Sequence, residues 1–392
     1  MKFTEYTLKQ LLVIKNGRDH KSIGDGPFPV YGSGGIMRYC ANFIYDKPSI
    51  LLPRKGSLDN IQYANFPFWT VDTLYYTEVN EKIANPYYLF RYLKLLDLSN
   101  LDTGTGVPSM TFDSYYNIKV NLPNLSEQNR IADLLIAIDR KIALNREINR
   151  NLEAMARQLY DYWFVQFDFP DENGRPYKSS GGKMVWNEKL KREIPKGWKE
   201  INLGDYLQCI TERIQPSDKD DYYTPIEVLP RKQMSFSDFV PIEEATSGLC
   251  RYKEGDILLS NRRVYFHKVC IAPSNGITRD TVIILRPQKG LLGYSFQLVF
   301  SDHFISYATQ HSYGSEQPVL SWEAAKKYKV VRPTNNIDAE YSIITNNIVA
   351  QILSNEREIR KLTNYRDMML PLLMNGQVSV MPPEVNCDLS HD

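Results

Sequence analysis

Ile50-Leu51-Leu52-Pro53-Arg54 in the first half of the chain is matched by Ile257-Leu258-Leu259-Ser260-Asn261, 207 positions later. Asp72-Thr73 is matched by Asp280-Thr281 at nearly the same offset. Further matches, each 210 positions apart, pair Pro108 with Pro318, Phe112 with Trp322, Val120 with Val330 and Pro123 with Pro333. Internal self-similarity on this scale indicates a duplicated architecture. Because a long helical pattern follows each copy, the sequence predicts the order globule, long helix, globule, long helix.

Size and composition agree with two globular domains. The chain has 392 residues, of which 43% are hydrophobic and 24% charged, and this is enough for two separate cores. We find no apolar run long enough to cross a bilayer, and the N-terminal residues lack a secretion-signal pattern. The five cysteines are scattered, without C-x-x-C spacing. These features predict unpaired thiols in a cytoplasmic protein, with no disulfide frame and no zinc site.

Charge is distributed unevenly along the chain. The formal net charge of +1 argues weakly against a nucleic-acid-binding protein. Residues 1–124, however, carry 13 Lys and Arg against 11 Asp and Glu, and residues 175–333 carry 24 against 18. Any contact with DNA is therefore expected to use local basic patches, with help from a more basic partner.

The first helical pattern is predicted over residues 125–166. Pro123 ends the preceding strand, Ser126 suits the N-cap, and Glu127 suits the first turn, where acceptors and negative charge are favoured. Apolar residues recur at heptad spacing for about four heptads, which predicts a coiled-coil seam. They form the row Ile131, Ile138, Leu152, Leu159, with Asn145 in line.

The second helical pattern is predicted over residues 337–377. Pro371 should kink or end this helix, and Gly376 is a suitable stop. Its heptad row contains Tyr341, Ile348, Asn355, Leu362 and Met369. Asn145 and Asn355 are themselves 210 positions apart and sit in otherwise apolar rows. They are either solvent-facing or, as we favour, a buried polar pair that fixes the register of two antiparallel helices.

Both globules are predicted to be mixed α+β. Strand-like segments in the first are 30–31, 49–52, 73–76 and 118–120. Strand-like segments in the second are 256–259, 268–271 and 281–285, followed by a helix over 294–309. Asn85-Pro86 has the composition of a helix start. The Gly-, Ser- and Pro-containing stretch 168–191 reads as a linker.

Motifs that could be catalytic have plainer explanations. Asn85-Pro86-Tyr87-Tyr88 resembles the N-P-P-Y signature of amino-methyltransferases, but the second proline is missing and a helix start fits better. Gly32-Ser33-Gly34-Gly35 lacks the spacing of a dinucleotide-binding loop, and no phosphate-binding P-loop occurs. Asp171-Glu172 lies in the linker. The sequence therefore predicts no catalytic residue, no bound metal and no cofactor for this chain.

Two basic turns at equivalent places of the repeat are candidates for DNA contact. Arg can read guanine, Asn can read adenine, and Lys suits phosphates. Glycine-rich loops at 32–35 and 102–106 could approach a DNA backbone closely. A single basic turn is usually a solvated surface, but two basic turns at equivalent places of a repeat favour DNA contact. The candidate residues are Ser33, Arg54, Lys55, Ser57, Thr105, Asn261, Arg262, Arg263, His267 and Lys268.

Several stretches resemble the specificity subunits of type I restriction–modification systems. Residues 122–168, from Leu122-Pro123-Asn124 to Phe167-Asp168, resemble the central conserved region of these subunits. Ile194-Pro195-Lys196-Gly197-Trp198 resembles the opening of their second recognition domain, and 364–376 resembles the end of their second conserved helix. The first half has Phe3-Thr4-Glu5-Tyr6 in place of a Pro-x-Gly-Trp opening. The resemblance covers the whole chain and is most specific in the helices.

The resemblance implies an α+β fold with two pseudo-twofold-related target recognition domains, separated by two long antiparallel coiled-coil helices. Each recognition domain would read half of a bipartite double-stranded DNA site. Two methyltransferase subunits, which bind S-adenosylmethionine, would dock on the assembly, and two motor–nuclease subunits would add restriction. The expected parts are a first recognition domain (1–124), first spacer helix (125–167), linker (168–193), second recognition domain (194–335), second spacer helix (336–378) and acidic tail (379–392).

Two other classes of function stay open at this stage. The chain could be a stand-alone DNA-modifying enzyme, either an adenine methyltransferase or a nuclease fusion. It could also be a coiled-coil adaptor that does not bind DNA. Binding of S-adenosylmethionine by the isolated chain would favour the enzyme, whereas a lack of sequence-specific protection of DNA would favour the adaptor.

Overall fold

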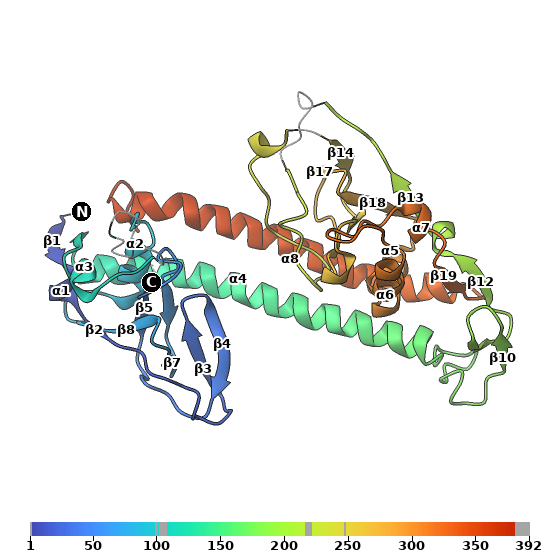
Figure 1. Cartoon of the computed structure of the whole chain (residues 1–392), viewed down its shortest axis with the longest axis horizontal. Helices are drawn as coiled ribbons and strands as arrows, with labels where there is room; N and C mark the ends of the chain where they lie inside the picture. Colours follow the sequence, from blue (N-terminus) through green and yellow to red (C-terminus); the bar gives the residue numbers. More distant parts are fainter. Residues whose placement is uncertain (1, 99–100, 102–107, 216–221, 247, 381–392) are drawn as a thin grey trace, which may run out of the picture. The chain divides into compact units, whose positions relative to one another are not determined.

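The computed structural model describes residues 2–98, 101, 108–215, 222–246 and 248–380. The chain forms two compact units (Figure 1). The first unit contains the chain up to Arg140 and from Asn364 onward, and the second contains Lys141–Thr363. Each unit therefore includes a globule and a segment of both long helices. The separation into recognition domains, spacer helices, linker and acidic tail stays a prediction, and most of the tail lies outside the described residues.

The first unit is built around a four-stranded antiparallel sheet in the order β2-β8-β5-β6. A second sheet has the order β4-β3-β7, and β1 pairs with β9. Its strands are β1 (Thr4–Thr7), β2 (Leu12–Lys15), β3 (Phe28–Gly32), β4 (Gly35–Cys40), β5 (Ser49–Pro53), β6 (Gln62–Ala64), β7 (Trp69–Thr70), β8 (Leu74–Val79) and β9 (Lys119–Leu122). Its short helices are α1 (Leu8–Leu11), α2 (Pro86–Leu93) and α3 (Phe112–Tyr116).

The second unit repeats this plan with the sheet order β13-β18-β15-β16. Smaller sheets pair β12 with β19, β14 with β17, and β10 with β11. Its strands are β10 (Met184–Asn187), β11 (Arg192–Pro195), β12 (Lys199–Asn202), β13 (Leu207–Ile210), β14 (Leu249–Tyr252), β15 (Ile257–Ser260), β16 (Val269–Ile271), β17 (Gly276–Arg279), β18 (Val282–Pro287) and β19 (Lys329–Arg332). Its helices are η2 (Asp161–Val165), η3 (Leu203–Asp205), η4 (Ile242–Glu244), η5 (Val264–Phe266), α5 (Leu292–Phe300), α6 (Asp302–Gln310) and α7 (Trp322–Ala325).

The duplication predicted from sequence extends to the pairing register. In the first unit Leu52 of β5 is opposite Tyr75 of β8, and in the second Leu259 of β15 is opposite Ile283 of β18. These positions are 207 and 208 residues apart. The predicted α+β class is confirmed, with strands at all the segments expected from the sequence.

The helix start at Asn85-Pro86 is confirmed. The requirements of a helix cap explain why the sequence Asn85-Pro86-Tyr87-Tyr88 resembles a methyltransferase motif. Asn85 caps α2 through its side-chain oxygen, which accepts hydrogen bonds from the N–H groups of Tyr87 and Tyr88. Pro86 occupies the first helical position, where no N–H is needed. Both tyrosine side chains are buried. The motif is therefore a helix cap packed into the core.

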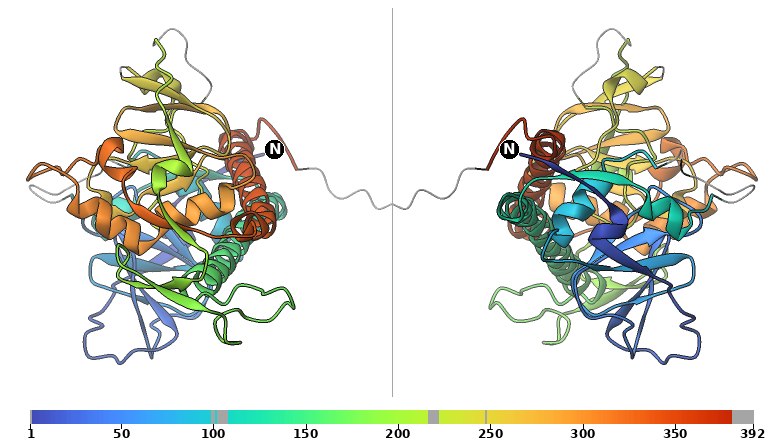
Figure 2. Two further views of the ribbon diagram at one scale, coloured as in Figure 1. Left: turned by 90° about the vertical axis from the view of Figure 1, so that its right-hand side faces the viewer. Right: turned by 90° about the vertical axis from the view of Figure 1, so that its left-hand side faces the viewer.

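The two long helices are α4 (Leu125–Tyr160) and α8 (Ile337–Met374). In the second unit the segments of these helices run antiparallel, because Asn145 bonds Glu358, Asn149 bonds Asn355 and the Ala156 carbonyl accepts from Tyr341. In the first unit Asp139 of α4 pairs with Arg366 of α8. Both long helices are seen nearly end-on in Figure 2. No helix among the described residues is long and apolar enough to span a membrane.

The ends of the long helices differ in detail from the prediction. Asn124, not Ser126, caps α4, because its side-chain oxygen accepts the N–H of Glu127 at 3.0 Å. Pro371 lies inside α8 without ending it. The helix ends at Met374, and Gly376 follows two positions later with a φ of +71°, which suits a residue without a side chain just past a helix end.

Asn145 and Asn355 are both buried, as the sequence analysis favoured, but they do not form a hydrogen bond with each other. Asn145 donates to the Glu358 carboxylate at 2.8 Å, and Asn355 donates to the Asn149 side-chain oxygen at 2.7 Å. The prediction of a direct pair is wrong by about one helical turn. The reason is that side-chain packing sets the register, and the repeat alone does not specify it.

One further expectation needs correction. The helix expected over 294–309 is interrupted, because Ser301 ends α5 and caps α6 by accepting the N–H of Phe304. The expected linker contains ordered structure, including the β10 strand of a hairpin. Within it Asp171 accepts the N–H groups of Asn173 and Arg175, which makes it a turn residue.

Candidate nucleic-acid interface

The turn after β5 is held by three backbone hydrogen bonds. The N–H of Arg54 donates to Thr73, the N–H of Gly56 donates to Pro108, and the Arg54 carbonyl accepts from Met110. Gly56 has a φ of +94°, which a residue without Cβ adopts easily. This framework leaves Lys55 and Ser57 exposed at the surface of the first unit.

The turn after β15 uses the same framework in the second unit. The N–H of Asn261 donates to Thr281, the N–H of Arg263 donates to Pro318, and the Asn261 carbonyl accepts from Leu320. Every bond has its counterpart in the first unit at an offset of 207 to 210 residues. Even the side chains correspond, since Arg54 donates to the Asp72 carbonyl at 3.3 Å and Asn261 donates to the Asp280 carbonyl at 3.0 Å.

The first unit brings the glycine-containing tip of the β3–β4 hairpin next to its basic turn. A Cβ placed on Gly56 would lie 3.3 Å from the Ser33 hydroxyl oxygen. Asn60 donates to the Ser33 carbonyl at 2.6 Å, which ties the hairpin tip to the same loop. Ser33, Lys55 and Ser57 therefore belong to one local surface. Thr105, the remaining candidate in this half, lies outside the described residues.

In the second unit Arg262 is the most accessible cation of the turn. Its side chain is exposed and donates to the Gln317 side-chain oxygen at 2.8 Å. Arg263 has a φ of +47°, and His267, at the other end of η5, has a φ of +55°. Left-handed backbone at residues other than glycine is strained and is common at functional sites. The turn thus presents its cations from a short segment held in a strained conformation.

His267 and Lys268 are occupied within the protein. His267 is 3% exposed, and its Nε2 lies 2.9 Å from the Phe300 carbonyl oxygen. Burial lowers the pKa of His267, which favours the neutral ring. Lys268 donates to the carbonyls of Ile226 and Glu227 at 2.7 and 3.2 Å, and burial lowers its pKa as well. We therefore do not retain either residue among the proposed contacts.

Other residues join the second turn that the sequence did not single out. The Arg231 guanidinium lies 4.0 Å from the centre of the Phe266 ring. Tyr265, with 49% of its surface exposed, packs against the same Phe266 ring at 4.8 Å. The Arg231-Lys232 pair is visible in the sequence, but about 30 residues separate it from the turn. Only the tertiary fold places it there. An exposed aromatic ring beside arginines is a surface suited to nucleic acid.

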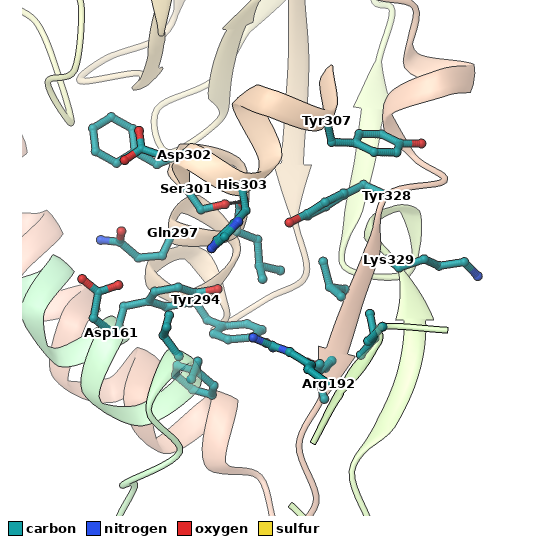
Figure 3. Close-up of a pocket in the computed structure, with 18 of the residues that line it drawn as sticks. Asp161, Arg192, Tyr294, Gln297, Ser301, Asp302, His303, Tyr307, Tyr328 and Lys329 are labelled. Atoms are coloured by element: carbon teal, nitrogen blue, oxygen red, sulfur yellow. Dashed lines mark hydrogen bonds between the residues drawn. The ribbon is translucent and has the colours of Figure 1, made fainter. Parts of the chain in front are cut away.

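A cavity of about 710 Å³ lies elsewhere in the second unit, beside the end of α4 (Figure 3). Tyr160, Phe164 and Tyr294 supply aromatic walls, and Tyr294 is fixed because its hydroxyl donates to the Val331 carbonyl at 2.8 Å. At the edge, Asp302 pairs with Arg157 at 3.0 Å. Burial raises the pKa of Tyr294, so it is a neutral phenol at pH 7. These contacts hold the aromatic walls and the edge of the cavity in place.

In the described ranges of the chain, no group of three or more His, Cys, Asp or Glu residues is arranged so that it could hold a metal ion. Cys40, Cys209, Cys250 and Cys270 are free thiols. Cys387 lies outside the described residues. For the four described cysteines, the structure agrees with the expectation of unpaired thiols.

Comparison with known proteins points to one family. A family model described as the type I restriction modification DNA specificity domain matches residues 2–154. The type I restriction enzyme MjaIX specificity subunit of Methanocaldococcus jannaschii is 22% identical over 367 residues, 88% of this chain and 81% of that protein. The HindI specificity subunit of Haemophilus influenzae is 22% identical over 373 residues, 77% of this chain and 79% of that protein.

A solved structure shares the fold. The crystal structure of the S subunit of a type I restriction–modification system from M. genitalium superposes with a TM-score of 0.61. That alignment covers 95% of this chain and 96% of the other at 16% identity. Residues 2–154 match the type I restriction modification DNA specificity domain, and most of the chain is similar to specificity subunits of type I restriction enzymes.

Proposed function

We propose that this chain recognises a bipartite DNA sequence and carries the catalytic subunits of its system to that sequence. The recognition domain at 1–124 reads one half-site, and the domain at 194–335 reads the other. The spacer helices at 125–167 and 336–378 set the gap between the half-sites. Asn145 and Asn355, with Asn149 as a newly identified partner, contribute to the register of the helices.

The observation that carries the proposal is the repeated hydrogen-bond framework of the two basic turns. The turn at Arg54 and the turn at Asn261 have the same backbone bonds and follow equivalent strands. A protein that presents two equivalent basic surfaces suits a target with two parts. The proposed contacts are Ser33, Arg54, Lys55, Ser57 and Thr105 in one domain, and Arg231, Asn261, Arg262, Arg263 and Tyr265 in the other.

The chain itself is the non-catalytic subunit and needs no cofactor of its own. Its proposed partners are two methyltransferase subunits, which bring S-adenosylmethionine, and two motor–nuclease subunits where the system restricts. We place the assembly in the cytoplasm, with access to double-stranded DNA. The near-neutral net charge of this chain agrees with a share of DNA binding being supplied by the partners.

Methylome sequencing tests this function. A host that expresses the chain with its methyltransferase subunit should acquire adenine methylation at a motif of two specified blocks with a fixed unspecified gap. A host that expresses the methyltransferase subunit alone is the control and should lack this motif. Methylation at an unbroken motif, or the same motif in the control, would refute the proposal.

The two alternative functions have their own readouts. A stand-alone methyltransferase predicts that the isolated chain binds S-adenosylmethionine, and we expect no such binding. An adaptor that does not contact DNA predicts no footprint on DNA that contains the motif. We expect protection of both blocks by the assembled complex.

A further inference from the structure

Residues 226–237, here called the strap, cross over the segment that joins η5 to β16. Six residues of the strap make contacts with residues 266–271, which include this segment and the adjoining ends of η5 and β16. Lys268 binds the carbonyls of Ile226 and Glu227, and the N–H of Lys232 donates to the His267 carbonyl at 3.0 Å. The Met234 carbonyl accepts from Ile271 at 2.7 Å, and the Ser235 hydroxyl donates to the Ile271 carbonyl at 2.9 Å. The sixth contact places Arg231 over Phe266.

These contacts make the strap part of the basic surface around the 261–267 turn. Leu229, Met234 and Phe236 are at most 3% exposed and anchor it in the domain. Between these anchors, Arg231 and Lys232 remain exposed next to η5. The position of the Arg231 cation therefore depends on how the strap is held.

One of the groups that hold the strap comes from spacer helix α4. A carboxylate oxygen of Glu153 accepts the N–H of Met234 at 2.9 Å. That N–H belongs to a residue 2% exposed, where a donor without a partner is costly. Spacer helix α8 reaches the same region through Glu356, which accepts from Asn149 of α4 at 2.8 Å and whose pKa is raised by burial and lowered by neighbouring Ser237 of the strap.

The same contacts continue into the helix pair. Asn149, which donates to Glu356 at 2.8 Å, also accepts from Asn355 at 2.7 Å. Hydrogen bonds therefore run from the helix–helix contact to Glu356, beside Ser237 of the strap, and Glu153 bonds the strap directly. All of these residues lie within the second unit.

We propose that Glu153 is a positioning residue for the second half-site. It fixes the strap, and the strap places Arg231 beside the 261–267 turn. Glu153 acts through Met234 and does not touch DNA itself. The inference rests on the proposed function, since it takes the 261–267 turn as a reader of DNA. It adds a physical link between a spacer helix and base recognition.

The raised pKa of Glu153 predicts a pH dependence of the strap that packing alone would not give. Burial raises its pKa to about 7, the Met234 N–H lowers it, and the neighbouring Glu356 raises it. The Cys270 thiol of β16 faces the same pair of carboxyl groups, and burial raises its pKa. A carboxyl whose pKa is higher in the folded state than in the unfolded state stabilises the fold at low pH. That contribution is lost as pH rises from about 4.5 to about 7.

Selection of bound duplexes from a randomised library, with the full chain in complex with its methyltransferase subunits, tests the proposal. Glu153→Ala should relax preference at the second half-site by about 5- to 10-fold and leave the first unchanged, since it leaves the Met234 N–H unpaired. Glu153→Gln keeps an acceptor of the same shape and should retain preference. Leu159→Ala, a control that packs against the same core, should lower stability without altering preference.

A double-mutant cycle tests whether Glu153 influences DNA recognition through Arg231. Arg231→Ala should relax the same positions, and adding Glu153→Ala to it should cause little further change, because the two residues act in series. Unchanged preference in Glu153→Ala, or equal relaxation at both half-sites, would overturn the proposal. Selection of no bipartite sequence by the unmodified complex would instead refute the proposed function.

Hydrogen exchange of the full chain tests, without DNA, whether Glu153 holds the strap in position. Strap amides at 231–237 should exchange about 10-fold faster in Glu153→Ala than in the unmodified chain, with η5 following. After correction for intrinsic rates, their protection should fall from pH 5 to pH 8, and this fall should be smaller in Glu153→Gln. Exchange unaffected by Glu153→Ala, or an equal pH profile in Glu153→Gln, would show that Glu153 does not position the strap.

Discussion

At the scale of single residues, the fold decides which cations are free to meet DNA. Arg262 and Lys268 are six positions apart, but Arg262 is exposed, whereas Lys268 is engaged by two carbonyls. His267 lies between them and is buried. A basic residue in a loop is therefore a weak guide to DNA contact until its hydrogen bonds are known. Lys55, on the exposed edge of the first turn, is a clear candidate for a phosphate contact.

We predict that Lys55→Ala weakens binding to all DNA sequences alike and lowers the slope of log affinity against log salt by about 1. The reason is that a phosphate contact releases counterions without reading bases. Binding titrations at several salt concentrations would measure both effects. Lys119→Ala, which removes an exposed cation paired with Glu5 on another sheet, should leave the slope unchanged. A change in sequence preference with Lys55→Ala would show that the residue reads bases.

A second residue-scale prediction concerns His267. Because burial lowers its folded pKa, the unfolded chain takes up a proton more readily as pH falls below about 6.5. Its stabilising contribution is therefore present above about pH 6.5 and is lost as pH falls through the folded pKa. His267→Gln should flatten the pH dependence of the unfolding midpoint of the second unit, with His303→Gln, an exposed histidine, as the control. Identical pH profiles for the native chain and His267→Gln would contradict this reasoning.

At the scale of secondary-structure elements, buried amides in the second unit tie α4 to α8. Asn149 and Asn355 are 4% and 5% exposed and share one hydrogen bond. Buried polar groups in a helix seam cost stability but disfavour shifted registers, in which they would lose their partners. The register actually adopted could not be predicted from the repeat, since a shift by one turn preserves the apolar rows.

Asn355→Ala should destabilise the second unit by about 1–3 kcal/mol, because it leaves the Asn149 oxygen buried without its donor. Asn347→Ala is the matched control, as Asn347 is an exposed amide on the same helix and should change stability by no more than about 0.5 kcal/mol. Chemical denaturation of the full chain, followed by a probe in the second unit, measures both. Equal effects of the two variants would mean that the buried pair contributes nothing specific.

At the scale of the whole molecule, the sequence predicted what repetition and periodicity encode. The duplicated strands at matched segments such as 50–54 with 257–261 and the two long helices were predicted, whereas the strand order of the two sheets was not. Long-range contacts without a periodic signal could not be predicted. The Met234–Glu153 bond joins residues 81 positions apart, and Arg231 reaches η5 through a segment with no counterpart among the quoted repeats. For the same reason the candidate site was predicted only in part.

The most direct test of one recognition domain per half-site compares Arg54→Ala with Arg262→Ala by selection from a randomised duplex library. The unmodified complex should select two specified blocks at a fixed spacing. Each variant should relax one position in a different block, at a cost of about 1–3 kcal/mol if the arginine reads a base. Relaxation of the same block by both variants, or selection of a single unbroken block by the unmodified complex, would contradict the account.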